Sequence, residues 1–406
     1  MRQFFCALIV IITLYSCNKE IESDYPLVFT GDVVNIKDTT ATFTAKISNT
    51  GAFTVLESGF VWGVHSQDDN GIQVKKSGGE AGSYSLQTNE KLLPGLTYYV
   101  RAYVRAESAI TYGREVSFSI PQAGPADTGN WSVIYDNHPP VGFSVAVTCG
   151  YTLDNITYLV FWNGTVYQYD HQANTFGFVV YNPDILGASL SVVYNSTAYI
   201  FVKNAFHKFD PQTNTFEKLK VLDESINLVG TSGFLIGDYI YIGLGVNHYT
   251  EYIKDFWKYS ITEDTWQQTA SFPGDFRQYG ISFSLNNSGY TGGGLNLLRN
   301  NLNPHFNDLW QYIPESDQWI QRENIPLEIK SMGILGNNTT DFGYCYYQNS
   351  FIEYNPDFDF WAGMASIHVE APFFPDFLFA VDKRIYLVMV TENDDDYYFK
   401  LLVYEK

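Results

Sequence analysis

The sequence predicts an all-β protein in which a β-sandwich is followed by a six-bladed β-propeller, closed by the propeller's own N-terminal strand. Aromatic residues make up 17% of the 406 residues, and such side chains suit half-buried pleated strands. Aromatic pairs seven positions apart recur from residue 169 onward at spacings of 40 to 53 residues, without the 3.6-residue periodicity of helices. The chain is also longer than one ordinary domain, which favours two.

Residues 1–16 predict an export signal and no part of the fold. Arg2 precedes an apolar run from Phe4 to Leu14, which is far shorter than the roughly 20 residues of a membrane-spanning helix. The end of the segment, "LYSC", resembles the lipobox of bacterial lipoproteins. That resemblance implies that Cys17 becomes the lipid-attached first residue, followed by a polar tether over residues 17–24. A plain secretory signal with an incidental cysteine is the alternative.

Charge and cysteine content exclude several classes of function. The formal net charge is −20, which would repel a phosphate backbone, so we expect no nucleic-acid partner. Cys149 and Cys345 are almost two hundred residues apart, and we expect small buried hydrophobes there more than an oxidised pair. The sequence shows no ligand spacing typical of a metal site and no cofactor-binding motif, so neither metal nor cofactor is expected.

Residues 25–120 predict the sandwich. "ATFTAKI" alternates apolar and polar residues, and "LLPGLTYYVRAYV" joins a Pro-Gly turn to another alternating strand. The second stretch resembles a strand region of fibronectin type III and immunoglobulin-like domains, which implies a spacer without chemistry of its own. Residues 121–130 contain two Pro, two Gly and no bulky apolar side chain, which is typical of a linker.

Residues 131–406 predict the propeller. In each repeat the first aromatic residue is expected to end one strand and the second to begin the next, with a polar turn between them. The five pairs are Tyr169 and Phe176, Phe209 and Phe216, Tyr259 and Trp266, Tyr312 and Trp319, and Tyr354 and Trp361. A sixth first residue, Tyr404, lies at the chain end, and Trp131 supplies the missing partner. Pairing these two strands would close the ring and protect its edges.

This part of the chain resembles kelch-type propellers. Such repeats place a Gly-Gly pair after their second strand, ahead of the aromatic hairpin. "GYTGGG" at residues 289–294 matches this pattern fully and "YIGLG" at residues 241–245 matches it in part, whereas the other repeats lack the glycine pair. The resemblance therefore implies the fold and no particular kelch subfamily.

Two long connections predict where a ligand would bind. Residues 245–255 and 294–308 join the second and third strands of neighbouring repeats, so they should leave the ring on the same face, where binding loops concentrate. The candidate ligand-binding residues on and beside them are His248, Tyr249, Glu251, Arg277, Asn296, Arg299 and His305. Arg277 could pair with a ligand carboxylate or with Asp275. Long loops without a binding role are an equal alternative.

These features lead to three hypotheses about function. The combination of lipid anchor, spacer and propeller resembles envelope lipoproteins of Bacteroidota-like bacteria, which implies an outer-membrane binding protein for a carbohydrate or an envelope protein. The propeller also resembles bacterial sialic acid mutarotases, which implies sugar epimerase activity using Glu251, Arg277 or Arg299 as acid–base groups. A structural subunit of an envelope complex is the third hypothesis. No catalytic residue is assigned from the sequence.

Overall fold

The computed structural model describes residues 25–405, except residues 38–39, 68–70, 89–91, 93–95, 108, 121–128, 138–145, 249, 299–303, 328, 331–333, 365–366, 368–373, 382 and 394–395. The chain divides into two compact units, residues 1–126 and residues 127–406. The division falls within the predicted linker, most of which lies outside the described residues, as do the predicted export signal and Cys17.

The first unit consists of two antiparallel sheets. One has the order β1 (Leu27–Lys37), β2 (Thr40–Asn49) and β5 (Gly82–Gln87). The other has the order β4 (Ile72–Ser77), β3 (Val55–Gly63), β6 (Thr97–Ala106) and β7 (Ile110–Tyr112), with β8 (Val116–Ser119) also paired to β6. Between them lies an aromatic core in which Phe43 contacts Phe60, Trp62 and Phe118.

The second unit is propeller-like, and its described residues form six four-stranded antiparallel sheets. The first three comprise β10 (Val147–Leu153), β11 (Ile156–Phe161), β12 (Thr165–Asp170) and β13 (Thr175–Tyr181); β14 (Ala188–Tyr194), β15 (Thr197–Val202), β16 (Ala205–Asp210) and β17 (Thr215–Lys218); and β19 (Ser232–Ile236), β20 (Tyr239–Gly243), β23 (Phe256–Ser260) and β24 (Thr265–Thr269). A short 3-10 helix, η1 (Pro183–Ile185), connects the first two. The described residues contain no helix that could span a membrane.

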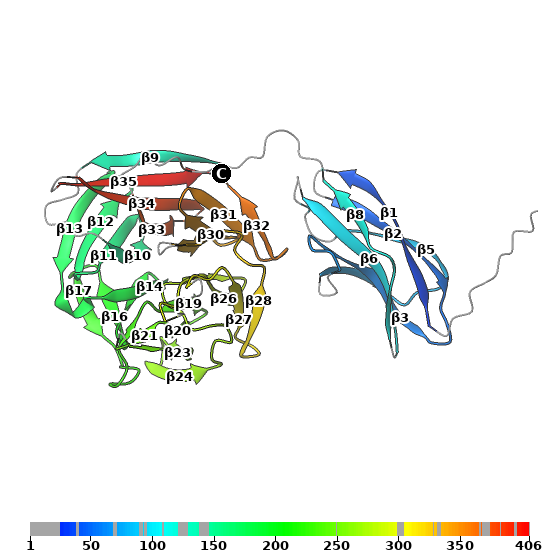
Figure 1. Ribbon diagram of the computed structural model, residues 1–406, viewed down its shortest axis with the longest axis horizontal. Helices are drawn as coiled ribbons and strands as arrows, with labels where there is room; N and C mark the ends of the chain where they lie inside the picture. The colour runs from blue at the N-terminus through cyan, green and yellow to red at the C-terminus, as the bar shows by residue number, and fades with distance from the viewer. Residues whose placement is uncertain are drawn as a thin grey trace, which may run out of the picture. The chain divides into compact units, whose positions relative to one another are not determined.

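The remaining three sheets complete the ring. They comprise β25 (Ile281–Leu285), β26 (Ser288–Gly292), β27 (Leu309–Ile313) and β28 (Gln318–Arg322); β29 (Leu335–Asn338), β30 (Gly343–Tyr347), β31 (Ser350–Asn355) and β32 (Phe360–Gly363); and β33 (Phe374–Val381), β34 (Arg384–Asn393), β35 (Asp396–Glu405) and β9 (Asn130–Asn137). The first strand of each sheet lies against that of the next, and β33 lies against β10. Figure 1 shows β10, β14, β19 and β33 near the middle of this unit and β13, β24 and β28 at its rim.

The aromatic repeat of the sequence is a hydrogen-bonded hairpin in the structure. Tyr259 and Trp266 are register partners, and the Tyr259 hydroxyl donates to Asp264 in the turn at 2.7 Å. Asp264 then accepts from the backbone amide of Lys220, which lies just after β17, the last strand of the preceding sheet. The Trp266 indole donates to the Lys220 carbonyl at 2.8 Å. The same arrangement recurs for Tyr312, Asp317, Trp319 and Ala270, and for Tyr354, Asp359, Trp361 and Glu323. The repeat therefore joins each of these sheets to its predecessor.

The predicted pairing of the first and last strands of this unit is confirmed. β9 pairs with β35 in antiparallel register, and Trp131 is the partner of Tyr404. Their rings also contact Phe351 of the neighbouring sheet. Both ends of the unit are thus held in one sheet, and β35 has a partner along its length.

Candidate functional site

The two long connections leave the second unit on one face, which we call the mouth. We call the first strand of each sheet its inner strand. The second strand of a sheet runs back to the level at which the inner strand started, so each inner strand begins at the mouth. The connection after β20 contains the short strands β21 (Val246–Asn247) and β22 (Glu251–Tyr252), which form a small sheet with β18 (Leu228–Val229). In the connection after β26, Leu295 forms β-bridges with Gln278 and with His305. Both connections are therefore built on regular backbone pairing.

Tyr252 ties the two connections together. Its hydroxyl accepts a hydrogen bond from the Gln278 amide nitrogen at 3.1 Å and another from the backbone amide of Leu297 at 3.0 Å. Nothing in the sequence pattern distinguished Tyr252 from its neighbours Tyr249 and Glu251, because the cross-loop contact depends on the folding of both connections.

Four of the seven predicted ligand-binding residues lie on the described parts of these connections. His248 is exposed and its Nε2 bonds the Ser225 carbonyl oxygen at 2.8 Å, and Glu251 is also exposed. Asn296 is buried, and its side-chain oxygen accepts from the Leu298 amide at 2.9 Å, which shapes the loop. His305 is held beside Leu295 by the bridge described above. Tyr249 and Arg299 lie outside the described residues.

Arg277 requires a correction, because the structure gives it an internal role. The side chain is fully buried, and its guanidinium makes a two-point contact with the carboxylate of Asp308, with one of the two distances at 2.8 Å. It lies over the rings of Phe272 and Phe306 and donates to backbone carbonyls, including that of Asp275 at 3.2 Å. The predicted two-point contact with a carboxylate is present, but the carboxylate belongs to Asp308 and not to a ligand.

Exposed apolar side chains gather on the loops of the mouth. Phe276 and Tyr279 are 43% and 46% exposed on the segment before β25, and Leu297 and Leu298 are each 64% exposed on the connection after β26. The Lys254 ammonium lies 4.7 Å from the centre of the Phe276 ring. We call these four apolar residues the mouth rim. Exposed aromatic rings beside polar groups suit the apolar face of a sugar ring or a protein partner.

Short polar side chains bridge the inner strands all around the ring. Within the described residues, each of the six interfaces between neighbouring sheets contains such a bridge. The bridges join Ser191 to the Gly150 carbonyl, Ser189 to Thr231, Ser284 to the Leu235 carbonyl, Asn338 to the Ser284 amide, Asn337 to the Leu378 carbonyl, and Asp376 to the Val147 amide. We call this set the collar. Five of its interfaces use neutral side chains, and the one between the last and first sheets uses a carboxyl group.

Asp376 is therefore the ionisable member of the collar. Its carboxyl oxygen accepts from the backbone amide of Val147 at 2.7 Å, across the interface between β33 and β10. Burial raises the pKa of the Asp376 carboxyl to about 6, and the hydrogen bond from Val147 opposes that rise only in part. A carboxyl group with a pKa near neutrality in the interior of a ring is suited to proton transfer.

Groups typical of metal or thiol chemistry are not assembled in the described residues. No cluster of three or more His, Cys, Asp or Glu side chains there could hold a metal ion. Cys149 and Cys345 are both buried free thiols, in agreement with the expectation that they serve as small buried hydrophobes. Burial raises the pKa of the Cys149 thiol to about 12, so it stays protonated.

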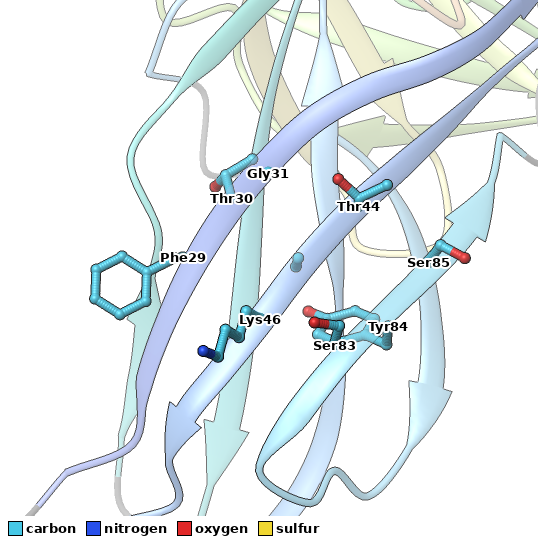
Figure 2. Close-up of a pocket in the computed structure, with 9 residues that line it drawn as sticks. Phe29, Thr30, Gly31, Thr44, Lys46, Ser83, Tyr84 and Ser85 are labelled. Carbon is cyan, nitrogen blue, oxygen red and sulfur yellow. The ribbon is translucent and has the colours of Figure 1, made fainter.

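A separate shallow hollow of about 450 Å³ lies on the first unit (Figure 2). Figure 2 shows Phe29 on β1, Thr44 and Lys46 on β2, and Ser83 and Ser85 on β5. Side chains alternate between the two faces of a sheet, and these residues lie on the outward face. Phe29 is 53% exposed. The hollow is an open sheet surface lined by polar side chains and by the aromatic residues Phe29 and Tyr84. Burial raises the pKa of the Tyr84 hydroxyl, so it stays protonated.

Comparison with known proteins gives one limited similarity. No family model matches the chain. The chain is 27% identical over 124 residues to an N-acetylneuraminate epimerase of Haemophilus influenzae (strain PittEE), and equally similar to the protein of that name from strain 86-028NP. The match covers 30% of this chain and spans only 30% of the length of each relative. It is a distant relationship that extends over a minor part of both proteins.

Proposed function

We propose that the second unit is a six-bladed kelch-type propeller that binds an acidic sugar of the sialic acid class and accelerates the exchange of its anomers. The observation that carries this proposal is the similarity to N-acetylneuraminate epimerases over 124 residues. The ring of four-stranded sheets and the mouth with its exposed aromatic rings support it, because propellers bind small molecules at the loops around their central axis.

The chemistry of anomer exchange suits the groups around the mouth. A cyclic sugar opens when a base takes the proton of the anomeric hydroxyl and the ring oxygen gains a proton, and neither step needs a metal or a redox cofactor. Glu251 is exposed at the mouth and remains a candidate for contact with the sugar. Arg277 is committed to Asp308 and is no longer a candidate acid.

Ligand-induced stabilisation of the full chain tests sugar binding directly. N-acetylneuraminate present at 100 times its dissociation constant should raise the free energy of unfolding by about 2.7 kcal/mol, which is visible as a higher melting temperature. Glucose, which lacks the carboxylate, should give a much smaller shift at the same concentration. Equal shifts with both sugars, or none with either, would contradict a site for acidic sugars.

We also propose, as a second candidate, an envelope lipoprotein that presents the mouth to a carbohydrate or to a protein. Its basis is the resemblance of "LYSC" to a lipobox and the exposed mouth rim, an apolar surface that a protein could cover. In this proposal Cys17 carries the lipid in the outer membrane and the first unit is a fibronectin III-like spacer. Replacing Cys17 with Ala should abolish labelling with a fatty acid, and persistent labelling would refute the anchor.

A further inference from the structure

Three sheets of the second unit contain the same irregularity at the start of the inner strand. The register between the first two strands shifts between Val147 and Cys149, between Ala188 and Leu190, and between Pro375 and Phe377. The extra residues are Thr148, Ser189 and Asp376, and all three are polar and partly exposed. The pairings of β19 with β20, β25 with β26 and β29 with β30 have no such shift over the described residues.

These three residues lie next to one another in space because their sheets are consecutive around the ring. β33 lies against β10, and β10 lies against β14. Each extra residue is near the beginning of its inner strand, and therefore at the level of the mouth. A bulge turns one side chain out of the regular alternation, and bulges concentrate beside active sites. The arrangement places two residues with hydroxyl groups and one with a carboxyl group on one side of the opening. The Thr148 hydroxyl donates to the Val160 carbonyl of its own sheet at 3.2 Å, so it can offer a ligand only its oxygen as an acceptor.

We propose that Thr148, Ser189 and Asp376 form the floor of the sugar site and that Asp376 is its proton-transfer group. This inference rests on the proposed epimerase function. Hydroxyl and carboxyl groups are the side chains that hydrogen-bond the hydroxyls of a sugar. The collar also places Thr231 beside Ser189, at 2.8 Å between the two hydroxyl oxygens, which extends the same polar surface.

Asp376 can carry out the transfer without any other titratable partner among the described residues. In the opening step the Asp376 carboxylate takes the proton of the anomeric hydroxyl, a carbonyl forms, and the bond from the anomeric carbon to the ring oxygen breaks. The ring oxygen takes a proton from water, and the Asp376 acid neutralises the hydroxide that remains. Closure on the other face of the carbonyl reverses these transfers, so neither protons nor electrons are gained or lost.

The surroundings of Asp376 fit this task. Burial raises the pKa of its carboxyl to about 6. A general base is most effective when its pKa lies near the pH at which the enzyme works, and a pKa of about 6 is close to neutral pH. The inner strands packed against β33 present the apolar side chain of Val147 on β10 and the neutral amide of Asn337 on β29. Among the described residues, the shift in the Asp376 pKa has no charged group among its causes, so Asp376 titrates independently of them.

Substitution of Asp376 by Asn gives the sharpest test. The amide oxygen of Asn can still accept from Val147, so the interface is retained while proton transfer is lost. We expect the rate constant for anomer exchange of N-acetylneuraminate at saturation to fall at least about 100-fold, with KM changed less than about threefold. The wild-type rate should decline below about pH 6, and this dependence should be absent from the residual activity of the variant.

Ser284→Ala is the matched control, because it removes a collar bond to Leu235 on a side of the ring without bulges. Its rate and pH profile should equal those of the wild type. Ser189→Ala tests the floor independently of Asp376 and should raise KM about tenfold with little change in rate at saturation.

The outcomes separate this inference from the function on which it rests. An inactive wild-type protein would overturn both. An active wild type whose Asp376→Asn variant keeps its rate and pH profile would overturn the role of Asp376 alone, and an unchanged KM in Ser189→Ala would overturn the floor. If the Asn variant does not fold, a wild-type rate that is constant from pH 5 to 8 would still refute the proposal.

Discussion

Trp131 and Tyr404 lie side by side in one sheet although they are at opposite ends of the second unit, and their ring centroids are 5.3 Å apart. They are register partners in the pairing of β9 with β35. Trp131 thus takes the place beside Tyr404 that the aromatic residue seven positions later takes in the other repeats. Its partner comes from the beginning of the unit, and the ring is closed by strand pairing.

Removal of β9 should therefore destabilise the second unit. A chain of residues 127–406 retains the strand, whereas a chain beginning at residue 138 lacks it and leaves the edge of β35 open. We expect the shorter chain to melt at a clearly lower temperature and to aggregate. Thermal unfolding followed by light scattering measures both properties, and equal melting temperatures would show that β9 does not close the ring.

The Arg277–Asp308 pair should be essential for stability. Arg277→Ala leaves the Asp308 carboxylate without its main partner at a site where the arginine is fully buried. Loss of one partner from a buried pair costs about 3–5 kcal/mol of unfolding free energy. Denaturant titration measures this cost. Arg384→Gln, which breaks an exposed pair with Glu405, should cost less than about 1 kcal/mol, and a similar effect of both variants would contradict the interpretation.

Asp376 should make stability depend on pH in a defined direction. Its pKa is raised from 3.8 to about 6 in the folded state, so the folded protein holds the proton more tightly. The contribution of Asp376 to the free energy of unfolding is therefore fully present below about pH 4 and is lost as the pH rises through 6. The loss is about 1.4 kcal/mol per pH unit and about 3 kcal/mol in total. The Asn side chain does not titrate, so the free energy of unfolding of Asp376→Asn should rise relative to that of the wild type by about 3 kcal/mol between about pH 4 and pH 7. A constant difference between the two proteins, measured by urea unfolding, would contradict the shift.

Tyr279 should contribute to sugar binding if the mouth rim is a stacking surface. Tyr279 has a positive φ of 55°. Tyr279→Ala removes the ring, and because alanine also has a Cβ, the backbone strain at this position is unchanged. Loss of one stacking contact of about 1.4 kcal/mol corresponds to a tenfold higher Kd. Calorimetric titration with N-acetylneuraminate would measure it. Tyr181 is also exposed but lies on the outer strand β13, so Tyr181→Ala should bind like the wild type.

The repeat could be predicted from the sequence because one local motif encodes each hairpin. The aromatic pairs expected from spacing are register partners in the structure, as in Tyr312 with Trp319 and Tyr354 with Trp361. Turn residues such as Asp317 and Asp359 adopt positive φ angles, which Asp and Asn tolerate better than most residues. Spacing, turn chemistry and aromatic packing all act within about ten residues, so they are visible in the chain.

The candidate site was less accessible to prediction from the sequence. The position of the two long connections in their repeats predicts that they share a face, and the Tyr252–Leu297 contact agrees with this. The buried pairing of Arg277 with Asp308, in contrast, depends on contacts between segments 31 residues apart. Asp376 has no such signal in the sequence, because its proposed role depends on a bulge and on the closeness of β33 to β10. Neither feature has a signature in the residues around it.

The most direct test of the proposed function is the rate of anomer exchange of N-acetylneuraminate, followed by NMR with and without the full-length protein. Our account predicts that catalytic amounts of the wild type accelerate the exchange strongly over the spontaneous rate, and that Asp376→Asn loses most of this acceleration. A wild-type protein that binds the sugar without changing the rate would contradict the epimerase proposal and favour a binding protein. The absence of both binding and acceleration would exclude an acidic sugar as its ligand.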